Sequence, residues 1–137
     1  MATFDELEHT ADWAFRARGE TLALLFINAA FAMFSLEGIQ AEGKKTGQTI
    51  IRELEVQAVD KEGLLVNWLN ELLYIAEVDR QFPVGIEILD LAPQRLRARL
   101  ELIAEERPDR RIKAVTFHNL RVEQTPHGWE ATVVVDV

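Results

Sequence analysis

The chain has 137 residues, which is enough for one domain of ordinary size and too few for two. It contains no cysteine, so disulfides, thiolate nucleophiles and cysteine-ligated zinc are excluded. The formal net charge of −8 argues against a general nucleic-acid surface, because neutralising phosphates needs clustered lysine and arginine.

The N-terminal segment gives no sign of export or membrane insertion. Its first residues carry acid where a secretory signal would be basic. The longest apolar run, residues 22–34, is too short to cross a bilayer. We therefore expect a soluble, cytoplasmic protein.

The first half of the chain is predicted to hold two helices. Residues 13–18 alternate as a strand, and the first helix follows over 21–37, with Glu20 or Thr21 as its N-cap and Gly38 just past its end. This helix is apolar nearly all round, which predicts burial on more than one side. A surface loop over 40–48, a strand over 49–59 and a second helix over 61–79 complete this half. The polar side of the second helix is expected to carry Asn67, Asn70, Glu71 and Tyr74.

From residue 82 onward the pattern is almost entirely β. Four strands are predicted, over 84–88, 96–102, 113–123 and 129–137, with turns at 92–94 and 125–128. Two helices set among these strands predict an α+β fold: a single domain, residues 1–137, in which two helices pack on a largely antiparallel β-sheet. A Rossmann fold is excluded because no glycine-rich strand-to-helix turn is present.

The last strand carries two negative groups at its end. Alternation places Trp129, Ala131, Val133, Val135 and Val137 on one face. Asp136 and the α-carboxylate of Val137 are then held next to each other, and Asp12 supplies another carboxylate near the N-terminus. If the sheet brings these groups together, three hard-oxygen donors converge and favour a divalent cation such as calcium, magnesium or manganese. The alternative is that Asp12 caps a turn and Asp136 is a solvated strand end.

Residues 113–118, Lys-Ala-Val-Thr-Phe-His, form a second candidate segment. As a strand it places Lys113, Val115 and Phe117 on one face and His118 on the other. Lys113 could orient a metal–carboxylate cluster or dock a partner's acidic group, or it could belong to an ordinary edge strand. His118 and His9 could form a metal-binding pair, although no further ligand spacing supports one.

Basic residues gather in the second half of the chain. Arg95, Arg97 and Arg99 alternate along one strand, and Arg107, Arg110, Arg111 and Lys113 follow. Such a local basic patch indicates a protein partner or a docked phosphate, and the alternative is a solvated strand face. Hydrolytic motifs are absent, and the single serine, Ser35, lies inside a helix expected to be buried, so a nucleophilic triad is excluded.

Five segments together resemble the archease family over the length of the chain. They are His-Thr-Ala-Asp at 9–12, Gly19 ahead of the first helix, Leu-Leu-Val-Asn-Trp-Leu-Asn-Glu-Leu-Leu-Tyr at 64–74, Lys-Ala-Val-Thr-Phe-His at 113–118, and Val-Val-Val-Asp-Val at 133–137. The sequence departs conservatively from the family, with Phe117 where tyrosine is frequent and Val137 where isoleucine is frequent.

The resemblance implies an accessory protein rather than an enzyme. Archease-like proteins support the RNA-splicing ligase that joins tRNA halves, promoting its guanylylation and multiple turnover, so RNA would be contacted only indirectly. The family's metal site, read as calcium, maps onto Asp12, Asp136 and Val137. Lys113 becomes the candidate for action on the ligase, with His9 and His118 as supports of that surface. The alternative is a chaperone-like interaction module without metal chemistry, and a small metal-dependent hydrolase is disfavoured.

Overall fold

The secondary structure follows the predicted order closely. The computed structural model describes residues 4–8, 13–40, 43, 48–109 and 111–137. Along the chain the elements are β1 (Phe4–Glu8), β2 (Trp13–Gly19), α1 (Leu22–Leu36), β3 (Ile50–Gln57), α2 (Lys61–Asp79), β4 (Gln81–Ala92), β5 (Arg95–Ala104), β6 (Ala114–Val115), β7 (Arg121–Thr125) and β8 (Gly128–Asp136). The predicted α+β class is confirmed, and every strand pairing among the described residues is antiparallel.

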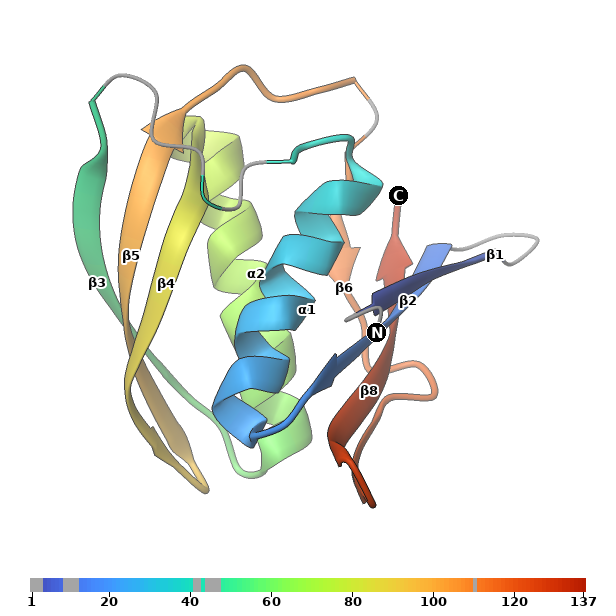
Figure 1. Ribbon diagram of the computed structural model, residues 1–137. Helices are drawn as coiled ribbons and strands as arrows, with labels where there is room; N and C mark the ends of the chain where they lie inside the picture. The colour runs from blue at the N-terminus through green and yellow to red at the C-terminus, as the bar shows by residue number, and fades with distance from the viewer. Residues whose placement is uncertain (1–3, 9–12, 41–42, 44–47, 110) are drawn as a thin grey trace.

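The strands are divided between two sheets, with the helices between them (Figure 1). One sheet has the order β1-β2-β8-β6, with β7 also paired to β8, and the other has the order β3-β5-β4. Both helices contact strands of both sheets. This position explains the composition of α1, since a helix covered on opposite sides needs apolar residues around most of its circumference.

Local sequence explains where the two helices begin. The Thr21 hydroxyl accepts a hydrogen bond from the Leu24 N–H at 3.1 Å, which makes Thr21 the N-cap of α1. Asp60 caps α2 in the same way through the Gly63 N–H, at 2.7 Å. The core side chains of α1 are Leu25, Phe26, Ala29, Ala30, Ala32, Met33, Phe34 and Leu36. Within the described residues, neither helix combines the length and apolarity that a bilayer crossing requires.

Two glycines allow close backbone contacts, one between β2 and the start of α1 and one between β8 and the end of β2. A Cβ atom on Gly19 would lie 2.3 Å from the backbone nitrogen of Leu25. Gly128 begins β8 with a φ of +135°, and a Cβ there would lie 2.4 Å from the carbonyl oxygen of Gly19. A side chain at Gly19 would push β2 away from α1, and one at Gly128 would push β8 away from the backbone of Gly19 and Glu20, so both positions require glycine.

The single strand predicted over residues 113–123 is wrong. The segment contains two short strands, β6 and β7, both paired with the same edge of β8. Between them Asn119 adopts a left-handed conformation with a φ of 52°, and the Leu120 N–H donates to the Phe117 carbonyl oxygen at 3.1 Å. Asparagine tolerates this conformation better than most residues, so the chain turns here although the residues around it suit a strand.

Candidate functional site at the end of strand β8

The end of β8 is held by neighbouring strands on both edges. Trp13 of β2 lies opposite Val135, and Ala114 of β6 lies opposite Asp136. The Lys113 N–H donates to the Asp136 carbonyl oxygen at 2.7 Å. Two residues that the sequence analysis selected separately, Lys113 and Asp136, are therefore brought together by the backbone.

Solvent reaches Asp136, the last residue of β8, and the following Val137, but not Val135 before them. Val135 is fully buried, whereas Asp136 is exposed and Val137 is 39% exposed. Asp136 and Val137 thus combine an anchored backbone with oxygen groups that face water. Such a strand end can present hard donors to a cation without rearranging the core.

Two of the predicted site residues, Asp12 and His9, lie outside the described residues. Trp13, which follows Asp12 in the sequence, is paired with Val135, which precedes Asp136. Within the described part of the chain, no three His, Asp or Glu side chains are grouped so that they could hold a metal ion. The described members of the predicted ligand set are Asp136 and Val137.

Strand β6 is fixed on its other edge by a side chain from α2. The Asn70 amide nitrogen donates to the Val115 carbonyl oxygen at 3.2 Å, and the Val115 N–H donates to Asn70 Oδ1 at 2.8 Å. Asn70 therefore takes the place of a neighbouring strand and orders the segment that carries Lys113. From the sequence, Asn70 could be assigned only to the polar side of its helix. The helical pattern does not distinguish a polar residue that bonds a neighbouring strand from one that faces water.

A depression of about 540 Å³ lies beside Lys113, between α2 and the segment before β6. Tyr74 stands at its wall with 61% of its surface exposed. The residues that line it are Asn70, Leu73, Tyr74, Glu77, Arg107, Arg111, Ile112 and Lys113. The depression thus combines apolar side chains, such as Leu73 and Ile112, with charged groups that include the exposed Lys113.

His118 lies in the turn after β6 rather than on a strand with Lys113. Its side chain is exposed, its N–H donates to Thr116 Oγ1 at 3.3 Å, and its ring Nε2 lies 3.3 Å from the Asn119 amide nitrogen. The predicted shared face of Val115 and Phe117 is also wrong, because Val115 is buried and Phe117 is 62% exposed. The turn, which ends the strand alternation after two residues, explains both differences.

The alternating arginines of β5 face acids rather than forming a basic surface. Arg95 Nη2 lies 2.7 Å from Asp90 Oδ2, and Arg99 Nη1 lies 2.9 Å from Glu87 Oε1. Arg97 is exposed and lies opposite Glu55 of β3 in the strand register. Cross-strand acids offset the positive charge here, so this face does not support a docked phosphate. Arg110, also assigned to the basic patch, lies outside the described residues.

The assignment of Arg107 to a basic surface patch is wrong, because its side chain is buried. Its Nη2 lies 2.6 Å from Glu37 Oε2, and the two side chains are 1% and 0% exposed. Burial raises the pKa of the Glu37 carboxyl above its usual value, against the lowering effects of the Ile112 N–H and Arg107. This pair was not predicted from the sequence, where the only signal for it is an isolated acid, Glu37, at the end of an apolar helix.

The chain is similar to known proteins over its whole length. The family model described as Archease protein family (MTH1598/TM1083) matches residues 4–137. Protein archease of Methanosarcina acetivorans is 40% identical, covering 98% of this chain and 95% of the relative. Protein archease of Pyrococcus abyssi is 34% identical, covering 100% of both chains.

Solved structures share the fold. The solution structure of Methanobacterium thermoautotrophicum protein 1598 matches with a TM-score of 0.72 and 29% identity, covering 100% of both chains. The crystal structure of an archease from Thermotoga maritima, described as a possible chaperone, matches with a TM-score of 0.63 and 22% identity, covering 97% of this chain and 96% of that one. With the family model and the curated relatives in agreement, the chain belongs to the archease family.

Proposed function

We propose that this protein activates an RNA-splicing ligase during tRNA processing and is not itself an enzyme. It promotes guanylylation of the ligase and multiple turnover in the cytoplasm, and it contacts RNA only through the ligase. Membership of the archease family supports the proposal. The observation that carries it is the hydrogen bond from the Lys113 N–H to the Asp136 carbonyl oxygen, because it joins a cationic and an anionic residue at one exposed edge.

The proposed surface bears a divalent metal ion, which we take to be calcium. Its ligands are the carboxylates of Asp12 and Asp136 and the α-carboxylate of Val137. Oxygen-only donors fit calcium or magnesium better than zinc. The exposure of Asp136 and Val137 supports the assignment, as does the pairing of Trp13, next to Asp12 in sequence, with Val135.

The proposed contact with the ligase centres on Lys113. This side chain is exposed beside the depression on α2, where it can pair with an acidic group of the partner. His118 is exposed in the turn after β6, and His9 lies three residues before Asp12 in the sequence. We assign both histidines to the same contact surface.

Activation by such a small partner follows from differential binding. A protein that binds the guanylylation-competent conformer of the ligase more tightly than the resting conformer raises the population of the former by the ratio of the two affinities. The metal ion and Lys113 supply contacts that one conformer accepts and the other does not. No group-transfer chemistry by this chain is required.

The test compares ligase guanylylation and turnover with the wild type, Asp136→Ala and Lys113→Ala, with and without divalent metal. Asp90→Ala is the matched control, since Asp90 is a partly exposed aspartate in the other sheet. We expect Asp136→Ala and Lys113→Ala to abolish stimulation and Asp90→Ala to preserve it. Undiminished stimulation by Asp136→Ala would rule out the proposed site.

Metal binding is checked separately by thermal unfolding. Calcium at about 100 times its dissociation constant stabilises a protein that binds it by about 2.7 kcal/mol. We expect the wild type to gain stability from calcium, and Asp136→Ala to gain much less.

The second candidate is a chaperone-like interaction module without metal chemistry. It is favoured by the description of the Thermotoga maritima structure as a possible chaperone and by the exposed aromatic residues Tyr74 and Phe117. If stimulation of the ligase proves independent of divalent metal and of Asp136, this second function is the better account.

A further inference from the structure

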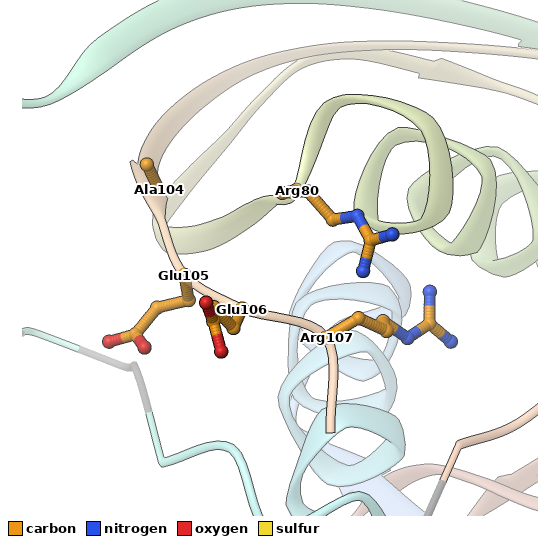
Figure 2. Close-up of a pocket in the computed structure, with 5 residues that line it drawn as sticks. All are labelled: Arg80, Ala104, Glu105, Glu106 and Arg107. Carbon is orange, nitrogen blue, oxygen red and sulfur yellow. The ribbon is translucent and has the colours of Figure 1, made fainter. Parts of the chain in front are cut away.

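The segment that leaves β5 sends one side chain into the protein interior. Ala104, Glu105 and Glu106 are exposed, whereas Arg107 is buried. Figure 2 shows the carboxylates of Glu105 and Glu106 on one side of this segment and the Arg107 guanidinium on the other. Arg107 therefore anchors a connection that would otherwise lie on the surface.

The buried pair of Glu37 and Arg107 forms hydrogen bonds with both main-chain polar groups of a single residue, Ile112. The Ile112 N–H donates to Glu37 Oε2 at 2.7 Å, and Arg107 Nη2 donates to the Ile112 carbonyl oxygen at 3.1 Å. Arg107 Nη1 also donates to the Leu73 carbonyl oxygen at 3.3 Å. The end of α1, the middle of α2 and the segment before β6 thus meet at one ion pair.

Ile112 is the residue immediately before Lys113. The Lys113 N–H donates in turn to the Asp136 carbonyl oxygen at 2.7 Å. One continuous path therefore runs from the buried carboxylate, through the Ile112 main chain, to the backbone at the exposed end of β8.

Stability alone is a poor explanation for this pair. Replacing a buried ion pair by apolar side chains of similar size is often neutral or stabilising, because two charges no longer need to be desolvated. Here Glu37 Oε1 and Arg107 Nε are also buried without a hydrogen-bond partner. Apolar side chains in place of this pair could not form hydrogen bonds with the N–H and the carbonyl group of Ile112.

We propose that Glu37 and Arg107 are positioning residues that fix the Ile112 main chain and thereby hold Lys113 against the Asp136 end of β8. This inference rests on the proposed function, since it gives the ion pair its purpose at the ligase-activating surface. Neither residue touches the ligase or the metal ion. Their effect is to present Lys113 and Asp136 in one fixed arrangement.

The test is the double variant Glu37→Leu/Arg107→Met, which removes both charges and leaves Ile112 without its side-chain partners. The matched control is Glu87→Leu/Arg99→Met, which removes a glutamate–arginine pair with a 2.9 Å contact and side chains 62% and 47% exposed. The first readout is hydrogen exchange of the Lys113 amide relative to the buried Val133 amide. The second is ligase stimulation, measured as the maximal effect and as the concentration that gives half of it.

We expect exchange of the Lys113 amide to rise about three- to tenfold relative to Val133 in the first variant, the range that corresponds to losing the neutral hydrogen bond from the Lys113 N–H to the Asp136 carbonyl oxygen once the Ile112 main chain is no longer held. The control is expected to leave this ratio unchanged. We also expect the maximal stimulation to fall in the first variant. An unchanged exchange ratio in a folded variant would overturn the positioning role.

Arg107→Lys keeps the proposal testable if the double variant does not fold. Lysine keeps the positive charge, but one ammonium group cannot bond Glu37, Leu73 and Ile112 in the geometry of a guanidinium fork. The same rise in Lys113 exchange is expected, and its absence contradicts the proposal. If the wild type fails to stimulate the ligase, the proposed function fails, while the exchange ratio still decides whether the ion pair holds Lys113.

Discussion

Asn70 is the residue whose side chain has the clearest local effect. Its amide group makes two hydrogen bonds with the Val115 main chain, one as donor and one as acceptor. An edge strand of two residues has too few ladder bonds to be stable alone. Asn70 supplies the pairing that β6 lacks on its outer edge.

Replacement of Asn70 by alanine is therefore expected to destabilise the protein by about 1–2 kcal/mol, because the Val115 N–H and carbonyl groups both lose a partner. Urea unfolding measures the change. Asn67→Ala is the control, since Asn67 is exposed and makes one bond, from its amide nitrogen to the Gln57 carbonyl oxygen at 2.8 Å. An equal loss of unfolding free energy in the two variants would mean that the two hydrogen bonds from Asn70 to Val115 of β6 are unimportant.

The packing of β2 against α1 depends on the close approach at Gly19. The atoms that a side chain would meet there are backbone atoms of Leu24 and Leu25, which cannot move without shifting the helix. Gly85 of β4 differs: a Cβ atom there would lie 3.4 Å from Glu101 Oε2, at the end of a flexible side chain.

Gly19→Ala is accordingly expected to cost about 3 kcal/mol of unfolding free energy, the upper part of the usual range for overpacking. Gly85→Ala serves as the matched control, with an expected change within about 0.5 kcal/mol. Thermal or urea unfolding distinguishes the two. A mild effect of Gly19→Ala would show that α1 can move away from β2 at low cost.

Most elements could be predicted from the sequence because their signals are local. Both helices were predicted correctly, since Thr21 and Gly38 mark the ends of α1 and regular apolar spacing marks α2. The division into two sheets could not be predicted, because alternation defines a strand but not its partner. The break at Asn119 was missed for a related reason, since a φ of 52° depends on the turn as a whole.

The whole molecule is three layers, and its central layer contains a buried ion pair at one end. The pair is Glu37 with Arg107, and the charged groups next to it are Glu77 and Arg111. The candidate surface residues Asp136 and Lys113 could be predicted because they stand in distinctive segments. Glu37 and Arg107 lie 70 residues apart in the sequence, so only the folded chain reveals their contact.

Stability is expected to depend on pH through Glu37. Its pKa is raised in the folded protein by burial, so the folded state binds this proton more tightly than the unfolded state. The contribution to stability is then fully present below the ordinary value of 4.5 and is lost as the pH rises through the raised pKa.

Glu37→Gln removes this titration and serves as the reference. We expect the free energy of unfolding of the wild type, minus that of the variant, to decrease as the pH rises from about 4 to 7. Urea unfolding of both proteins across this range provides the measurement. A difference that stays flat or increases would contradict the raised pKa.

The pairing of β8 also has a consequence for folding during translation. This strand lies between β2 on one edge and β6 with β7 on the other, yet the ribosome makes it after all of them. Until β8 emerges, β2 has an unfilled edge, and β6 and β7 lack the strand with which they pair. The nascent chain therefore carries unpaired strand edges until β8 is made, and this sheet can be completed only after its last strand has emerged.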